Sequence, residues 1–364
     1  MRDPSIENRR QLGRVAAISI FASSILLVLA FLEVAFRVFN PLGISYYPET
    51  ARYMDTLVLA GGVGYRNQPN LHGTFWGAPV SINSLGLRDR EISLAPLPNE
   101  FRILVMGDSW PFGIGVRADQ SLSYLLERMI AEDARENIPI RTIDMGVPSY
   151  NTEAELAQFQ SLGCKLHPNL VVLLFAINDI EPKMWIFNKR RHWYVNWAQR
   201  SYVACVAFST VRSTMDRAAA RGGQQKGGSD TTGMYALYKP NEPRWLAIDN
   251  SMAELNRECR AEGVPFVVFS EAGPATPPGK LLASLGRRET FPVVPLSPIA
   301  DPRWRGRAVD LRNSPTDGHP NVEGNRADAT LIYENLRRLG LLDSVLKTPR
   351  PAAAEAQILN RERK

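Results

Sequence analysis

Cysteine is scarce in this sequence, with three residues in a chain of 364. Cys164, Cys205 and Cys259 lie far apart, so they form neither a disulfide framework nor a metal-binding motif, although one bridge is compatible with an oxidising compartment. A chain of this length buries a sizeable core without covalent cross-links. We therefore expect no metal site, and no motif indicates a cofactor.

The central part of the chain lacks an excess of charge of either sign. The formal net charge of +6 lies in the two ends, because residues 1–14 hold four arginines against two acidic side chains, and residues 337–364 hold seven basic side chains against three acidic ones. A nucleic-acid-binding protein more often has a basic body or stripe, so no nucleic-acid partner is expected. Residues 346–364 are predicted to form a disordered tail.

One long hydrophobic run is present near the N-terminus. Val15 to Leu32 contains no charged residue, and at 18 residues it is just long enough to span a bilayer. The apolar character continues beyond it, which predicts a transmembrane anchor over 15–38 after a basic cytoplasmic tail over 1–14. The positive-inside rule then places the body outside the cytoplasm. The alternative is a signal peptide cleaved after Ala30.

A candidate nucleophile follows a short apolar segment in the middle of the chain. Ile103 to Met106 has the character of a strand buried on both faces of a parallel sheet, and the segment stops at Gly107-Asp108-Ser109. Ligands collect beyond the carboxyl ends of such strands. A serine hydroxyl needs a nearby base and donors for the oxyanion that forms when it attacks a carbonyl.

A candidate base lies close to the other end of the chain. The sequence holds four histidines, and His319 is the one preceded by an acid, Asp317, and followed by a helix start at Pro320 and Asn321. The remaining three are predicted to be structural or exposed; they are His72, His167 and His192.

Two further apolar segments end in polar or flexible residues. Ile138 to Val147 ends around Gly146, and Leu170 to Asp179 ends in Asn178-Asp179. Each alone is an ordinary turn or cap. Taken in order, a serine, a glycine, an asparagine and a histidine at four successive sheet ends are far more specific for nucleophilic catalysis.

These blocks resemble those of the SGNH or GDSL hydrolase superfamily, in particular its bacterial membrane-anchored members. The resemblance covers about residues 80–340 and includes the segment Ile82 to Asp89, which reads INSLGLRD. It implies that Ser109 is the nucleophile and His319 the base, with Asp317 orienting the imidazole. It also implies an oxyanion hole formed by the Ser109 amide, the Gly146 amide and the Asn178 side chain.

Two positions depart from the usual pattern of that superfamily. The block Gly-x-Asn-Asp is Ala176-Ile177-Asn178-Asp179 here, and many members place the aspartate three residues before the histidine, where this chain has Thr316. Members with the Asp-x-His spacing, including alginate acetylation proteins, are similar to this one. The alternative is that Asp317 only caps the turn and a backbone carbonyl orients the histidine, which leaves a Ser/His dyad.

The alternation of strand and helix patterns predicts a three-layer α/β/α sandwich around a parallel sheet, the SGNH hydrolase fold. The predicted strands are Phe101 to Met106, Thr142 to Gly146, Leu170 to Phe175 and Pro265 to Phe269. The predicted helices are Asp119 to Glu136, Asn151 to Leu162, Arg244 to Ala261 and Val322 to Leu339.

The predicted hydrolase-like domain spans 96–345, follows an N-terminal extension over 39–95 and contains an insertion over 180–243. The insertion begins with an aromatic and basic stretch, Met184 to Arg200, and continues with a linker-like stretch, Arg221 to Gly233. It is predicted to be a lid over the active site, where aromatic rings stack on sugars. A membrane-facing or merely solvated segment is the alternative.

The sequence therefore predicts a serine esterase or O-acyltransferase, acting on acyl groups such as acetyl on cell-envelope or exported polysaccharide. The expected location is the bacterial inner membrane, with one span and the catalytic domain in the periplasm. An acyltransferase would need an acyl supply, for which a multispanning membrane partner is a conjecture. The alternatives are a membrane-anchored binding or assembly protein that has lost its chemistry, and an esterase for lipids or small esters.

Overall fold

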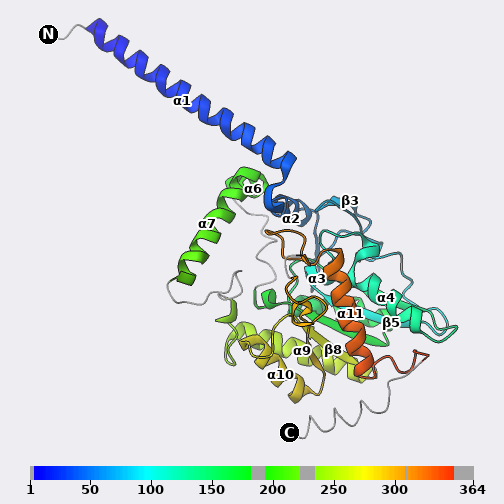
Figure 1. Ribbon diagram of the computed structural model, residues 1–364. Coiled ribbons are helices and arrows are strands. Elements are labelled where there is room, and N and C mark those ends of the chain that lie inside the picture. The colour runs from blue at the N-terminus through cyan, green and yellow to red at the C-terminus, as the bar shows by residue number, and fades with distance from the viewer. Residues whose placement is uncertain (1–3, 182–192, 222–233, 308–309, 348–364) are drawn as a thin grey trace.

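The computed structural model describes residues 4–181, 193–221, 234–307 and 310–347 (Figure 1). Its centre is a five-stranded parallel sheet in the order β6-β5-β7-β8-β9. The strands are β5 (Phe101–Gly107), β6 (Ile140–Asp144), β7 (Leu170–Phe175), β8 (Phe266–Ser270) and β9 (Val293–Pro295). Because all five run in one direction, their carboxyl ends share one edge of the sheet.

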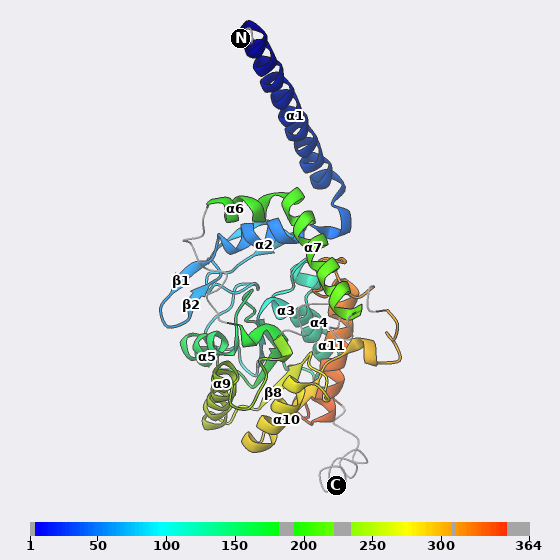
Figure 2. The same cartoon turned by 90° about the vertical axis from the view of Figure 1, so that its left-hand side faces the viewer.

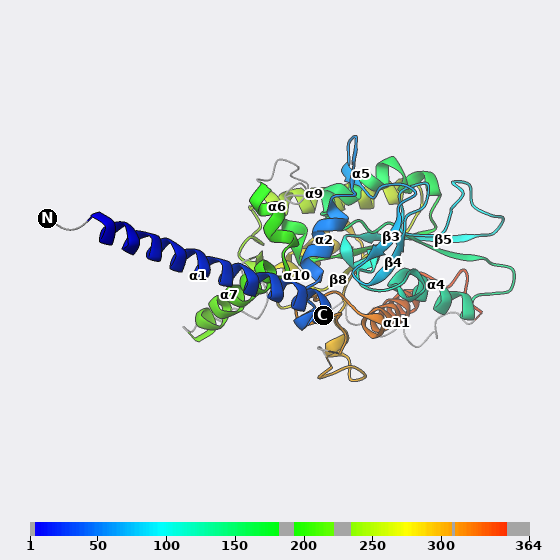
Figure 3. The ribbon, with the colours of Figure 1, turned by 90° about the horizontal axis from the view of Figure 1, so that it is seen from above.

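Helices cover both faces of this sheet, as Figure 3 shows from above. On one face lie α5 (Thr152–Ser161), α9 (Pro243–Ala261) and α10 (Pro277–Glu289), and on the other α4 (Leu122–Asp133) and α11 (Val322–Arg338). Successive residues of β5 alternate between the two cores: Leu104 packs in the first and Ile103 in the second. The predicted three-layer α/β/α sandwich is confirmed.

The predicted strands correspond to β5, β6, β7 and β8 within two residues at each end. The helix predicted from Asp119 is preceded by a 3-10 turn, η2 (Ala118–Gln120), and α4 begins only after Ser121, whose hydroxyl accepts a hydrogen bond from the Tyr124 amide. The sequence reading included neither the short edge strand β9 nor helix α10.

The N-terminal helix α1 (Pro4–Phe39) projects away from the body in Figures 1 and 2. Its segment Gly13–Phe39 is long and apolar enough to cross a membrane, and it is not buried against the protein. By length and composition this segment fits a membrane anchor or a signal sequence.

The extension after α1 packs against the domain that contains the five-stranded sheet. A 3-10 turn, η1 (Pro41–Gly43), leads into α2 (Tyr46–Met54) and two hairpins, β1 (Val58–Ala60) with β2 (Gly64–Arg66) and β3 (His72–Phe75) with β4 (Ala78–Ser81). Side chains of the extension, including Tyr53 and Tyr65, form a third core with residues that follow β5 and β6. The latter include Phe112, Val147 and Tyr150. The extension thus contributes buried side chains to this third core.

Part of the insertion forms two helices at the foot of α1 (Figure 2). Helix α6 (Trp193–Arg200) packs against α2, and α7 (Tyr202–Arg221) packs against the end of α1. Residues 182–192 and 222–233, and with them most of the aromatic and basic stretch and the linker-like stretch, lie outside the described residues.

The first two residues of the predicted tail, 346 and 347, pack against the folded domain. Leu346 is buried and pairs with Ala134, and the Lys347 amide donates to the Asp133 carbonyl. Residues 348–364 of the predicted tail lie outside the described residues.

Candidate active site

Ser109 stands where β5 ends and a single helical turn, α3 (Ser109–Phe112), begins. Gly107 makes the sharp turn with φ of 150°, and a Cβ there would press on the Pro111 ring and on the Leu174 carbonyl. Asp108 caps the turn by accepting a hydrogen bond of 3.0 Å from the Trp110 amide. The serine hydroxyl is therefore presented at the carboxyl edge of the sheet.

The structure brings Ser109, His319 and Asp317 together, although 210 residues separate the serine from the histidine. The His319 Nε2 atom lies 2.8 Å from Ser109 Oγ, and His319 Nδ1 lies 2.6 Å from Asp317 Oδ1. With Nδ1 donating to the carboxylate, Nε2 is the acceptor that faces the serine hydroxyl. A carboxylate orients the imidazole, so the geometry favours a triad over the Ser/His dyad.

His319 does not lie at a sheet end, which corrects the expectation of four successive strand ends. It lies in the loop between the 3-10 turn η5 (Pro298–Ala300) and α11, where Asn321 caps the helix by accepting from the Gly324 amide. The loop is held by hydrogen bonds from Asn313. The Asn313 backbone amide donates to the His319 carbonyl, and its side-chain Nδ2 donates to Asp317 Oδ2.

Buried carboxyl groups control the protonation of the histidine. Burial alone would lower the pKa of His319, but the hydrogen bond and charge of Asp317, with smaller contributions from Asp108 and Glu271, outweigh it and raise the pKa above its usual value. The charged form of the imidazole is thus favoured relative to that of a free histidine.

Asn178 lies just after β7, on the 3-10 turn η4 (Ile177–Ile180). Its Nδ2 atom donates to Asp108 Oδ2 at 2.9 Å, which fixes the side chain beside the nucleophile. An amide nitrogen carries two N–H groups, so a second donor remains for an oxyanion. The Ala176 methyl group is buried without interrupting this arrangement.

Gly146 has a packing role that the sequence did not indicate. A Cβ at this position would collide with the backbone of Phe112, so only glycine fits against α3. The Gly146 amide donates to Asp144 Oδ1 at 2.8 Å. Its proposed part in an oxyanion hole therefore requires Asp144 to release it, and the assignment stays a prediction.

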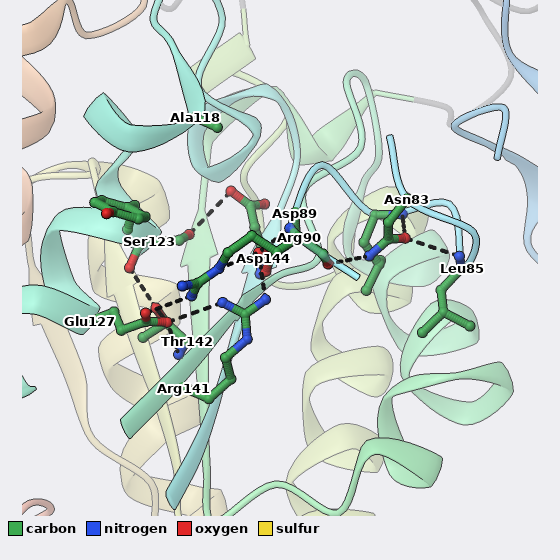
Figure 4. Close-up of polar contacts among 12 residues, drawn as sticks. Asn83, Leu85, Asp89, Arg90, Ala118, Ser123, Glu127, Arg141, Thr142 and Asp144 are labelled. Atoms are coloured by element: carbon green, nitrogen blue, oxygen red, sulfur yellow. Dashed lines mark hydrogen bonds and ion pairs between the residues drawn. The ribbon is translucent and has the colours of Figure 1, made fainter. Parts of the chain in front are cut away.

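The INSLGLRD segment, Ile82 to Asp89, forms hydrogen bonds that hold the loops around Ser109. The Arg88 guanidinium is buried and donates to the carbonyls of Phe112, Gly113 and Val116, which holds the loop that follows Ser109. Asp89 Oδ2 accepts from the Asp144 amide. Asn83 accepts from the amides of residues 85 and 87 and so shapes the turn (Figure 4).

Asp89 also belongs to an ionic network that lines a cavity of about 220 Å³ (Figure 4). Arg141 lies 2.7 Å from Asp89 and 3.3 Å from Glu127, and Ser123 donates to Asp144. Burial raises the pKa of Asp89 to about 6 and that of Asp144 to about 8, with the charge of Asp89 adding to the second shift. Asp144 is accordingly protonated over much of the neutral range.

Two more acids are buried beneath the site. Burial, and the proximity of other carboxyl groups, raise the pKa of Glu155 and of Asp179 well above the usual range. Within the described part of the chain, neither Glu155 oxygen has a hydrogen-bond partner, and Asp179 has one, from the Thr152 hydroxyl. Burial therefore disfavours the charged form of both acids.

Comparisons with known proteins give similarity in structure only. No family model matches the chain, and no curated protein matches it. Among solved structures, a lipolytic protein of the G-D-S-L family from Desulfitobacterium hafniense is 9% identical, with a TM-score of 0.38, covering 64% of this chain and 98% of that one.

A lipase/acylhydrolase from Enterococcus faecalis is 14% identical, with a TM-score of 0.39 and coverage of 69% of this chain and 100% of that one. An acetyl xylan esterase is 9% identical, with a TM-score of 0.39 and coverage of 65% and 100%. Similarity at this level decides neither activity nor substrate, which have to be argued from the site itself.

Proposed function

We propose that this protein is a serine esterase or O-acyltransferase of the SGNH/GDSL type that works through an acyl-Ser109 intermediate. The observation that carries the proposal is the continuous hydrogen-bonded chain from Ser109 Oγ through both nitrogens of His319 to Asp317, with distances of 2.8 and 2.6 Å. This arrangement activates a serine for attack on a carbonyl carbon.

In the first half-reaction the Ser109 proton passes to His319 Nε2 while Oγ bonds to the acyl carbonyl carbon. The second N–H of Asn178 and the Ser109 amide face the oxygen that becomes negative, and the Gly146 amide joins them if Asp144 turns away. The ester bond then breaks as His319 returns the proton to the departing alcohol oxygen. Water releases the acyl group in a hydrolase, whereas a sugar hydroxyl accepts it in a transferase.

For the substrate we propose acyl groups, acetyl among them, on cell-envelope or exported polysaccharide. Support comes from the sequence resemblance to membrane-anchored members of the superfamily and from the apolar helix α1. With α1 as an uncleaved inner-membrane anchor, the body works in the periplasm. In a transferase, a multispanning membrane protein supplies the acyl group.

A binding protein that has lost its chemistry is the second candidate, and one observation favours it. Two of the three donors assigned to the oxyanion hydrogen-bond to carboxyl groups, because Asn178 donates to Asp108 and the Gly146 amide donates to Asp144. An esterase for lipids or small esters, in contrast, would use the same site with a different acyl chain.

The test is turnover of a short-chain chromogenic acyl ester by the full chain in detergent. We expect release of the chromophore that disappears in Ser109→Ala and in His319→Ala. Folded wild-type protein without turnover would favour the binding protein. Acetylated oligosaccharides offered with and without a free sugar acceptor then separate hydrolysis from transfer.

A further inference from the structure

The segment between α1 and α2, residues 40–46, lies directly against the loop that carries His319. The Thr316 hydroxyl donates to the Leu42 carbonyl at 2.9 Å, one residue before Asp317. Gly43 backs onto Ser314, and a Cβ at this position would collide with the Ser314 hydroxyl. This junction segment therefore forms one wall of the catalytic loop.

At the end of the junction segment, Tyr46 places its ring on the catalytic imidazole. The centroids of the Tyr46 and His319 rings are 5.6 Å apart, with the planes tilted by 45°. Burial raises the pKa of the Tyr46 phenol, and the charges of Asp317 and Asp108 add to the shift, which shows how close the ring lies to the acids of the site.

The position of the Tyr46 ring is fixed from its far side. Its hydroxyl hydrogen-bonds with Thr50 one turn further along α2, and Thr50 Oγ1 accepts a hydrogen bond of 2.9 Å from Trp76 Nε1. Trp76 belongs to the packed core of the N-terminal extension. The far side of the ring is therefore contacted by residues of the N-terminal extension, which lies outside the sheet domain.

From this geometry we infer that Tyr46 is a positioning residue for His319, supplied by the N-terminal extension. Its ring closes one side of the imidazole and keeps it aligned with both Ser109 and Asp317. An aromatic ring within about 6 Å of a cation also stabilises that cation, here the imidazolium formed when Ser109 is deprotonated. This inference rests on the proposed function, since it concerns the same proton transfer.

The experiment compares three variants of the full chain in detergent: Tyr46→Leu, Tyr46→Phe and Tyr47→Leu. Leucine fills the space but removes the ring, so we expect kcat for the chromogenic ester to fall about tenfold with KM nearly unchanged. We also expect the acidic limb of the kcat/KM profile to move to lower pH. In this variant Asp317, Asp108 and Glu271 still raise the pKa of His319, but the contribution of the ring is lost.

Tyr46→Phe keeps the ring and should retain near-normal kcat and an unmoved acidic limb. Tyr47→Leu makes the same change at the next position of α2, whose ring contacts Tyr46, and should also leave the limb unmoved. An unchanged kcat in Tyr46→Leu would overturn the inference, and so would a change confined to KM, which would make Tyr46 a substrate contact.

Failure of this inference is distinguishable from failure of the proposed function. If wild-type protein turns over the ester and loses that activity in Ser109→Ala, the proposed function holds, and an unaffected Tyr46→Leu variant rejects the inference alone. If the wild-type protein has no activity, the rate at which a fluorophosphonate labels Ser109 replaces kcat as the readout. Absence of labelling in folded wild-type protein rejects both.

Discussion

The Asp317 carboxylate accepts three hydrogen bonds. Oδ1 accepts from His319 Nδ1 and from the His319 backbone amide, and Oδ2 accepts from Asn313. Replacement by a neutral amide keeps the shape but removes the charge that stabilises the imidazolium. We expect Asp317→Asn to lower kcat by about 10²-fold or more while the protein stays folded. Kinetics with the chromogenic ester check this, and a loss below about twofold would support the Ser/His dyad instead.

The buried acid Asp144 should make the stability of the protein fall as the pH rises toward about 8. Its pKa is raised by burial to about 8, above the unfolded value of 3.8, so the neutral acid favours folding. That contribution is complete at pH values below the unfolded pKa and is lost as the pH rises through about 8.

Thermal unfolding of wild-type protein and Asp144→Asn between pH 6 and about 9.5 measures this loss. Because an asparagine has no proton to lose, we expect the melting temperature of wild-type protein to fall more steeply than that of the variant from pH 6 to about 8, and the two curves to run parallel at higher pH, where Asp144 is ionised in both the folded and the unfolded state. Parallel curves below pH 8 would mean that Asp144 is not the titrating group.

The nucleophile and the acid–base pair could be found from sequence because each has a local signal: a strand end for Ser109, and an acid followed by a helix start for His319. Asn313 and Tyr46 had no such signal. An asparagine in a loop and a tyrosine after a hydrophobic helix are common, and their contacts with Asp317 and His319 exist only once distant segments meet. Arg88 lies in the INSLGLRD segment, but its four carbonyl partners were not predictable from sequence.

The N-terminus of helix α7 is capped by Glu33, a residue of α1. The Ser201 hydroxyl and the amides of residues 202 and 203 all donate to the Glu33 carboxylate, which caps α7 from another element. Loss of such a cap costs about 1 kcal/mol. We expect Glu33→Ala to loosen α7 from α1, seen as faster hydrogen exchange of the amides at the start of α7.

Asp55→Ala provides the control for this change, because it removes an exposed ion pair between α2 and Arg200 without uncapping α7. Equal exchange rates at the start of α7 in Glu33→Ala and wild-type protein would contradict the capping role. A larger effect in Asp55→Ala would assign the docking to the ion pair.

Gly43 of the junction segment has a matched control, Gly62, in the turn between β1 and β2. Gly43 and Gly62 both have positive φ, at 74° and 77°, but a Cβ at Gly43 would strike Ser314, whereas at Gly62 nothing lies within 4 Å. Both alanine variants carry the same backbone strain, of about 1 kcal/mol. We expect only Gly43→Ala to displace the catalytic loop and lower kcat, and equal kcat losses in the two variants would contradict the contact.

At the scale of elements, the buried strands were the most predictable part. β5 and β7 are continuous apolar runs bounded by turn residues. β9 is three residues long and contains proline, too short for a periodicity to emerge. The loop of His319 was placed wrongly at a sheet end because its hydrogen bonds come from Asn313, not from a neighbouring strand.

Over the whole molecule, three segments that are separate in the sequence meet at the C-terminal end of α1. They are helix α2, the insertion helices α6 and α7, and the loop of His319 (Figures 1 and 2). If α1 spans the membrane, the catalytic loop lies within a few residues of the bilayer surface.

The broad organisation followed from composition and periodicity, since an apolar N-terminal run and an alternation of strands and helices are long-range signals. For the N-terminal extension and the insertion the sequence predicted segment bounds but no individual helices or strands. Their helices and hairpins are stabilised mainly by contacts with other segments, such as the core around Tyr53 and Phe112. Local propensity does not encode such contacts.

Covalent acylation of Ser109 tests the central claim most directly. The measurement is the intact mass of the full chain in detergent after brief exposure to an activated acetyl ester, followed by mapping of the modified peptide. We expect one acetyl group on Ser109, or rapid turnover, and neither in Ser109→Ala. A folded wild-type protein that shows no adduct and no turnover, or an adduct that persists unchanged in Ser109→Ala, would contradict the claim.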